Sequence, residues 1–311
     1  MTTDISAIRL RRKKLNSFKL FLYVLPAVAV VFLFSYAPLW GWSFAFIHYK
    51  PGRSFSNSPF CGLAYFHALF GNEVMLSNLL RVLKNTFGIH LLGYLFTPLP
   101  MMFAILLNDM RGVKYKKLVQ SLTTLPHFIS WVILFSLATS IFGSTGLISK
   151  LLAGAGKSDR FVNILTTDKH VWLIQVLLQQ WKGLGWSSIV YFAAIAGLDQ
   201  QLFEAAMVDG AGRWKRIWYI TIPQMLPTYF VLLIMSIGNF LNTGVDQYLA
   251  FGNALNKASI EVLDLYVYNL GIGSGQISFS VAVGIMKSVV AFILFFFANG
   301  VSKKVRGTSV F

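Results

Sequence analysis

Six long apolar runs constrain the fold more than any other feature of this 311-residue sequence. Residues 20–47, 85–107, 118–149 and 217–245 contain no Asp, Glu, Lys or Arg, while 170–198 contains only Lys182 and 277–301 only Lys287. A helix needs about 20 residues to cross a bilayer, and backbone groups in lipid must bond within the segment. The sequence therefore predicts an all-α integral membrane protein with six transmembrane helices.

The net charge of +16 has to be reconciled with this prediction, because a strongly basic chain can also indicate nucleic-acid binding. Only 12% of the residues are charged, about half of the 25% that is typical of soluble domains. The Lys and Arg residues lie in short segments between the apolar runs, which is a membrane pattern. We therefore expect no nucleic-acid partner.

The distribution of Lys and Arg also predicts an orientation, because cytoplasmic segments of membrane proteins are enriched in these residues. With both ends on one side, that side carries sixteen of them and the opposite side nine. We expect a multi-pass protein of the cell membrane with both termini in the cytoplasm. Its parts are a basic N-terminus (1–19), a transmembrane domain (20–301) and a cytoplasmic tail (302–311).

Several kinds of chemistry find no support in the sequence. The five histidines show no metal-ligand spacing, Cys61 is the only cysteine, and His, Asp and Glu form no cluster suited to catalysis. The segment Gly156–Lys157–Ser158 resembles the end of a nucleotide-binding P-loop, but Leu151 occupies the position of its first glycine. No predicted span contains a carboxylate that could carry protons. We expect no metal, no catalytic residue and no bound cofactor.

The predicted cytoplasmic loop at 199–223 has a distinctive composition. Residues 204–212 read EAAMVDGAG. The Glu-Ala-Ala core favours a short helix from 199 to 207, with Asp199 as its N-cap. Gly210 and Gly212 allow a sharp turn through positive φ angles, and Pro223 is expected to open the fifth span. Such a helix forms a low-profile knob that can enter a groove on another protein.

This loop resembles the EAA loop of ABC-importer permeases, whose pattern is E-A-A, three residues, G, nine residues, I, one residue, L-P. The chain departs from the pattern only at Ile222, which replaces the Leu. The amino-acid sequence of the loop is similar to that of carbohydrate importers of the maltose type, especially the branch that handles polysaccharide fragments. The resemblance extends from about residue 118 to the end and implies a MetI-like permease core.

The resemblance implies that the loop docks into separate ABC ATPase subunits, which bind ATP and Mg²⁺. It also implies a second permease subunit and an extracytoplasmic solute-binding protein. Glu204 would pair with a basic group of the ATPase, and the alanines would allow close approach. Asp209 could instead stabilise the turn as an Asx residue. The predicted coupling residues are Glu204, Ala205, Ala206, Asp209, Gly210, Ile220 and Pro223.

The two intramembrane lysines suggest a solute pathway, because a charge at a helix centre costs about 2.5–3.5 kcal/mol to insert. Lys182 lies within an aromatic and glycine-rich segment, 181–186. The resemblance places solute contacts in this segment and at the end of the fifth span, with Lys182 and Asn239 departing from the maltose pattern. The predicted pathway residues are Trp181, Lys182, Gly183, Trp186, Ser236, Asn239, Phe240, Thr243 and Lys287.

Two lysines facing a pathway would suit an acidic oligosaccharide. The alternatives are that Lys287 pairs with Asp246 or Asp264 or contacts the second permease, and that the Lys182 side chain lies along Trp181. Residues 246–248 could form an outer gate or a capped helix end. An ABC permease for a non-sugar solute and a membrane-embedded transferase are the competing functions.

Overall fold

The computed structural model describes residues 19–110, 112–156 and 163–306. The predicted N-terminal part (1–19) lies outside these ranges except for Lys19, as does the end of the predicted tail (302–311) beyond Arg306. Apart from one isolated β-bridge between Ile47 and Phe60, the described residues form helices, turns and loops. The predicted all-α class is therefore confirmed.

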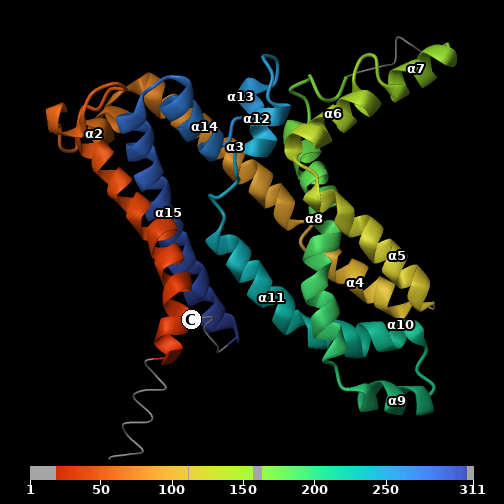
Figure 1. The fold of residues 1–311 in the computed structure, drawn as a ribbon. Helices are drawn as coiled ribbons and strands as arrows, with labels where there is room; N and C mark the ends of the chain where they lie inside the picture. Colours follow the sequence, from red (N-terminus) through yellow and green to blue (C-terminus); the bar gives the residue numbers. More distant parts are fainter. Residues whose placement is uncertain (1–18, 111, 157–162, 307–311) are drawn as a thin grey trace, which may run out of the picture. The chain divides into compact units, whose positions relative to one another are not determined.

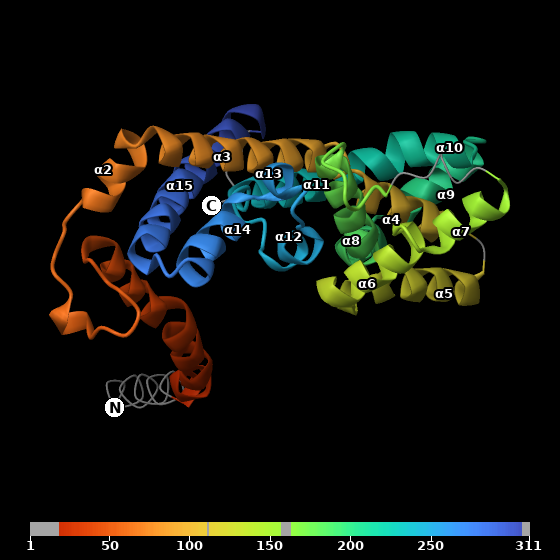
Figure 2. The same ribbon diagram turned by 90° about the horizontal axis from the view of Figure 1, so that it is seen from above.

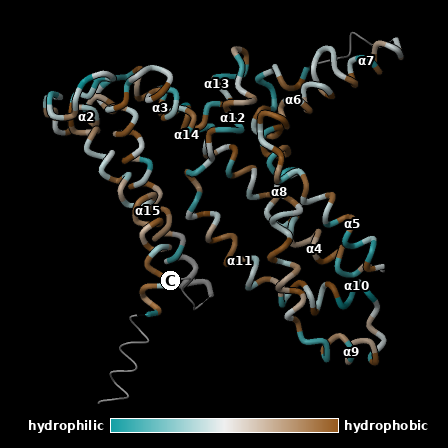
Figure 3. Tube along the Cα trace, in the orientation of Figure 1, coloured by the Kyte–Doolittle hydropathy of each residue, from teal (hydrophilic) through white to brown (hydrophobic). Residues whose placement is uncertain are grey.

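Within the described residues, five helices are long and apolar enough to cross a membrane. These five candidate spans are Lys19–Phe46, Glu73–Asp109, Trp131–Gly154, Arg213–Gly238 and Ile277–Phe297. Apolar residues run along these helices in Figure 3. In the first of them, large hydrophobic side chains such as Phe34 are exposed over most of their surface, as expected for a helix solvated by lipid.

The chain divides into two compact units, one of which combines Met1–His67 with Leu270–Ile285. Its first helix changes from α to a π segment, η1 (Phe32–Tyr36), and then to a 3₁₀ segment, η2 (Ala37–Phe46), around Pro38. A short 3₁₀ turn, η3 (Phe55–Asn57), and α2 (Ala64–Gly71) follow. Ser278 at the start of α15 (Ile277–Arg306) donates to the Ile47 carbonyl and accepts from Tyr49 N–H, and so ties this unit together.

The second unit takes Ala68–Asn269 and the chain from Met286 onward. Its first elements are α3 (Glu73–Tyr94), α4 (Leu99–Asp109), α5 (Val113–Thr124), η4 (Leu125–Phe128), α6 (Trp131–Phe142) and α7 (Leu147–Gly154). They are followed by α8 (Val171–Ala196), α9 (Gln200–Val208), α10 (Arg213–Arg216), η6 (Ile217–Thr221) and α11 (Ile222–Gly238). The short helices α12 (Asp246–Phe251), α13 (Lys257–Ile260) and α14 (Leu263–Tyr268) and the π segment η7 (Asn269–Gly273) precede α15.

Several predicted spans differ from the observed helices. The run over 85–107 is divided between α3 and α4, and the predicted span over 170–198 forms α8, which is not among the five candidates. The expected helix over 118–149 is broken between α5 and α6, because Pro126 cannot donate a backbone hydrogen bond and Ser130 caps a new helix through the N–H of Ile133. The candidate span consequently begins at Trp131 and extends to Gly154. The expected span over 217–245 begins earlier, at Arg213, and ends earlier, at Gly238.

Helix α8 is the centre of the second unit. It packs against α3, α4 and α5, and both ribbon views show α4, α5 and α8 side by side (Figures 1 and 2). One buried cluster joins α4, α8 and α11 through residues such as Ala104, Tyr191 and Met225. Another surrounds Val176, Tyr248 and Phe251 and joins α8 to α12. The positions of the side chains on α8 therefore follow from packing on three neighbouring helices.

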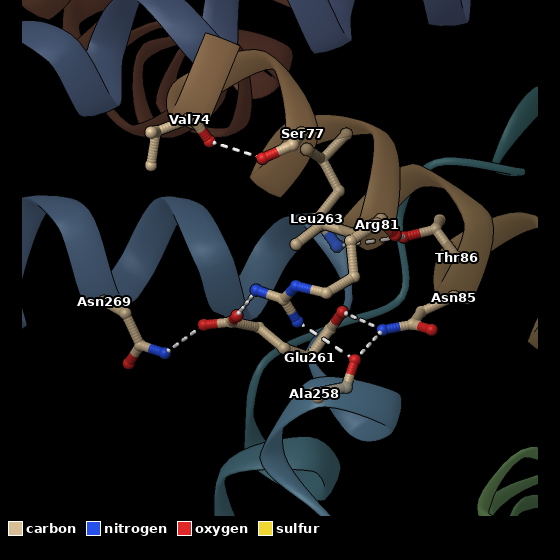
Figure 4. A network of polar contacts seen from close by, with 10 residues as sticks. Val74, Ser77, Arg81, Asn85, Thr86, Ala258, Glu261, Leu263 and Asn269 are labelled. Carbon is tan, nitrogen blue, oxygen red and sulfur yellow. Dashed lines mark hydrogen bonds and ion pairs between the residues drawn. The ribbon is translucent and has the colours of Figure 1, made fainter.

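A polar network connects α3 with the segment between α13 and α14 (Figure 4). Arg81 forms an ion pair with Glu261 at 2.7 Å, and the Asn85 amide donates to the carbonyls of Ala258 and Glu261. The opposite carboxylate oxygen of Glu261 accepts from Asn269. Burial, followed by the neighbouring Glu261 carboxylate, raises the pKa of the Tyr266 phenol, while Arg81 lowers it. The network fixes the connection between α11 and α15 to the start of α3.

Gly185 allows α8 to approach α5 closely. A Cβ atom at this position would overlap the backbone of Thr123 and lie 2.6 Å from the amide nitrogen of Thr124. We expect Gly185→Ala to lower the free energy of unfolding of the purified protein in detergent by about 1–3 kcal/mol, because the backbone of α5 or α8 must move to make room for the added methyl group.

Gly183→Ala is the matched control, since its Cβ would meet only Ser187 Oγ at 3.9 Å. The better helix propensity of alanine, up to about 1 kcal/mol, should make this variant neutral or slightly stabilising. Equal unfolding free energies for the two variants would contradict the close contact between α8 and α5.

Candidate functional site

The 199–223 loop contains an exposed, capped helix where the sequence predicts one. Helix α9 begins after Asp199, whose side chain accepts a hydrogen bond from Gln201 N–H at 2.9 Å. Glu204 and Ala205 are exposed, and Ala206 is half-buried. Figure 1 shows α9 at one end of the second unit, next to α10. The Glu-Ala-Ala segment thus lies on an accessible surface.

The turn after α9 depends on one glycine rather than two. Gly210 has a φ of 72°, as predicted, whereas Gly212 has an ordinary φ of −64° and precedes α10. The Asp209 side chain forms no hydrogen bond within the described residues, so the Asx alternative gains no support.

Pro223 lies in the first turn of α11, as predicted, but the fifth span begins earlier than expected. The helix is continuous from Arg213 to Gly238, and Ile220 lies in its π-helical part, η6. Proline removes a hydrogen bond within a helix, and a π turn is a common way to accommodate such a defect. The chain therefore leaves the Gly210 turn directly into the long helix that contains α11.

Lys182 on α8 is hydrogen-bonded to the break between α5 and α6. Its ammonium group donates to the carbonyls of Pro126, His127 and Ile129 at 3.2, 2.6 and 2.7 Å. It also lies 5.4 Å from the centre of the Trp131 ring, in cation–π range. The ammonium group of Lys182 is thus directed to the η4 turn and Trp131.

Trp186 forms an aromatic surface with two residues that the sequence analysis did not identify. Its ring is parallel to that of His127 at 4.4 Å and edge-on to that of Phe128 at 5.8 Å. Trp181 and Trp186 are about half exposed, and Gly183 lies between them. The signal that could have identified His127 and Phe128 is Pro126 within an apolar run, because a helix break presents neighbouring side chains and carbonyls to adjacent helices.

The second predicted set lies where α11 ends. Ser236 Oγ donates to the Leu233 carbonyl, and Asn239 caps the helix while its amide donates to the Met235 carbonyl. Phe240 is only 7% exposed and packs against Phe87. Phe240 therefore contributes to the core in this structure, whereas Asn239 is accessible.

Asp264 organises the turn that follows α11. One carboxylate oxygen accepts from Thr243 N–H, Thr243 Oγ1 and Gly244 N–H at 2.9, 3.2 and 3.0 Å. The other forms an ion pair with Lys287 on α15, and both side chains are 16% exposed. The alternative of a Lys287–Asp264 pair is thus confirmed, and the charge of Lys287 is neutralised within the chain.

The 246–248 segment is a helix start whose later residues are buried. Asp246 is the exposed first residue of α12, whereas Tyr248 is buried and Gln247 donates to the side chain and carbonyl of Gln175 on α8. Asp246 and Lys182 both border an open cavity of about 360 Å³ beside Trp131. Among the described residues, no hydrogen bond or ring contact joins the predicted α8 residues to those at the end of α11.

Comparison with known proteins identifies the family. A model of binding-protein-dependent transport system inner membrane components matches residues 97–307. The chain belongs to this family. It is therefore a multi-pass permease, a transport subunit rather than an enzyme.

Two relatives come from Bacillus subtilis strain 168. Protein LplB is 39% identical, with 92% of this permease and 88% of LplB covered. The polygalacturonan/rhamnogalacturonan transport system permease protein YteP is 38% identical, with coverages of 95% and 91%.

The permease is also similar to a chain of a bacterial ABC transporter involved in the import of the acidic polysaccharide alginate. The TM-score is 0.81 and the identity 32%, and the match covers 96% of the permease and 99% of that chain. A second structure of that transporter, with the same TM-score, contains an alginate pentasaccharide-bound periplasmic protein.

The two members of the Lys287–Asp264 pair should differ in their effect on stability. Asp264→Ala removes the carboxylate that accepts three hydrogen bonds in the turn and leaves a largely buried cation unpaired, which should cost about 3–5 kcal/mol. Lys287→Ala leaves a carboxylate that still accepts three hydrogen bonds, and should cost about 2 kcal/mol, as for the loss of one charged contact.

Denaturant unfolding of the purified variants in detergent would measure both costs. The double variant Asp264→Ala/Lys287→Ala should be more stable than Asp264→Ala alone, because it contains no unpaired buried cation. Equal destabilisation by the two single substitutions would contradict the central role assigned to Asp264.

Proposed function

We propose that this permease imports an acidic oligosaccharide by ATP-driven alternating access, with α9 as the helix that receives the force from a separate ATPase. The observation that carries the proposal is the accessible Glu-Ala-Ala surface on a capped helix at one end of a bundle of apolar helices. Glu204 would contact a basic group of the ATPase, Ala205 and Ala206 would allow close approach, and Gly210 would set the turn.

The proposed topology has six membrane crossings and both termini in the cytoplasm. Helix α8 would supply the sixth crossing: its 26 residues span about 39 Å at 1.5 Å per residue, which exceeds a hydrocarbon core of about 30 Å. Under this topology residues 20–301 form the transmembrane domain, and the 199–223 loop lies on the cytoplasmic side. The excess of Lys and Arg in the proposed cytoplasmic segments supports this orientation.

The proposed assembly contains two ABC ATPase subunits, a second permease subunit and an extracytoplasmic solute-binding protein. ATP and Mg²⁺ would bind to the ATPases, and the permease would hold no cofactor. The described residues contain no group of three or more His, Cys, Asp or Glu side chains that could hold a metal ion.

Two names support an acidic oligosaccharide as the proposed solute: YteP is a polygalacturonan/rhamnogalacturonan transport system permease, and the solved transporter is involved in the import of the acidic polysaccharide alginate. The half-exposed rings of Trp181 and Trp186 suit the apolar faces of sugars. Lys182 would supply positive potential, because carbonyl groups saturate its hydrogen-bond donors without neutralising its charge. Lys287 would act through the position of the Asp264 turn rather than as a free cation.

Charge reversal on α9 tests the coupling role. Glu204→Lys should abolish ATP-dependent uptake and reduce the amount of ATPase that co-purifies with the permease, because an exposed acid would be replaced by a cation at the proposed contact. Glu73→Lys is the matched control, since Glu73 is an exposed acid in the first turn of α3, outside the loop. Full ATPase association and uptake in the Glu204→Lys variant would refute the proposed docking helix.

Competition for uptake tests the solute class. In vesicles containing the complete importer and its binding protein, an unlabelled galacturonate trimer should compete with labelled solute at least about tenfold better than maltotriose, a preference of about 1.4 kcal/mol. Equal competition would overturn the acidic class, and competition by neither sugar would favour a non-sugar solute.

A further inference from the structure

The 199–223 loop has a single ion pair to the rest of the second unit among the described residues. Arg213, the first residue of α10, contacts the carboxylate of Asp109, the last residue of α4. Arg213 lies three residues after Gly210, where the chain turns with positive φ. The pair is therefore the first charged attachment that the chain makes to the bundle after the turn that follows α9.

Helix α9 itself has little contact with the bundle. Only Phe203 and Ala206 of its nine residues are half-buried, and the others are exposed. A polar cavity of about 320 Å³ lies beneath it, bordered by Asn108, Asp109, Phe203, Met207 and Arg216. Force applied to α9 cannot pass through an apolar interface of the kind that joins α4 to α8, because such an interface requires buried side chains.

The C-terminal end of α4 is tied on two sides. Besides the Asp109–Arg213 pair, the Lys116 ammonium group on α5 donates to the backbone carbonyl of Asn108. Ala104 and Ile105, one turn earlier on α4, belong to the buried cluster that contains Tyr191 of α8 and Met225 of α11. Asp109 thus lies about one turn from a buried cluster that α4 shares with α8 and α11.

We propose that Asp109 is a positioning residue of the transport cycle: its ion pair with Arg213 transmits the movement of α9 into the α4–α8–α11 cluster. The inference rests on the proposed function of α9 and adds the route by which its movement reaches the bundle. Arg213 begins the continuous helix that ends at Gly238, so the pair also fixes the start of the helix that leads to Ser236.

The pair is suited to transmission rather than to stability. The side chain of Arg213 is 50% exposed and that of Asp109 30%. Ion pairs with this degree of exposure contribute little to folding, because water screens them. Substitution should consequently leave the permease folded and assembled, which separates a loss of coupling from a loss of structure.

The test compares uptake per ATP hydrolysed in vesicles that contain the complete importer. Asp109→Asn and Arg213→Gln should each lower this ratio about fivefold or more, a range typical of coupling between sites. The amount of co-purified ATPase should remain at the wild-type level. Lys215→Gln is the matched control, since Lys215 is an exposed cation on α10 without an ion pair in the described structure.

Two further variants test whether the ion pair itself, rather than either side chain alone, is required for coupling. Asp109→Glu should retain most of the ratio, and the exchange Asp109→Arg/Arg213→Asp should recover at least part of what either single substitution loses. An unchanged ratio in the single variants, or an exchange no better than they are, would overturn the inference. Loss of ATPase association in Asp109→Asn would also overturn it, whereas loss of association only in Glu204 variants would leave it standing.

Discussion

Every break in a membrane helix leaves backbone groups that lipid cannot satisfy, and the arrangement of the second unit depends on how one such break is resolved. Pro126 follows the end of α5, and the carbonyls of His127 and Ile129 have no backbone donor among the described residues, whereas the Pro126 carbonyl accepts from Ile129 N–H. Lys182 donates to all three. A charge within a helical bundle in lipid is costly, but this one satisfies two carbonyls that have no backbone donor, each of which would also be costly to leave unpaired. The same contact brings the 125–128 turn against α8 and places His127 and Phe128 beside Trp186.

Asp264 plays a comparable part at the end of α11. The turn after this helix exposes backbone N–H groups, and the carboxylate accepts two of them together with the Thr243 hydroxyl. Its charge is in turn balanced by Lys287. Lys182 and Lys287 are therefore both bound to structures that end or interrupt a helix. The two surfaces proposed for the solute owe their shapes to these contacts.

The sequence predicted much of the fold because apolar runs and the cost of unpaired backbone groups leave few alternatives. It also predicted α9 with its Asp199 cap and the positive φ of Gly210, which depend on local chemistry alone. It failed where a local signal had two outcomes. Pro126 ends one helix so that a second begins at Trp131, whereas the helix that contains Pro223 continues from Arg213 through a π turn.

The partners of the charged residues were only partly predictable. Asp264 was a candidate for Lys287, but Asp246 was equally acceptable by sequence, and only the path of the chain between α12 and α14 decides between them. The contact between Asp109 and Arg213 joins residues far apart in the sequence that lie at the ends of different helices. No spacing rule relates such positions, so the route from α9 into the bundle required the structure.

The most direct test of the account is the accessibility of position 181 during the transport cycle. Trp181→Cys in a Cys61→Ser background provides one thiol, because Cys61 is the only cysteine of the chain. A membrane-impermeant maleimide would be applied from either side to the complete importer in vesicles, without nucleotide and after trapping with ATP and vanadate. Alternating access predicts that the side from which the thiol is labelled changes between the two states. Labelling from the same side at the same rate in both states would contradict the account.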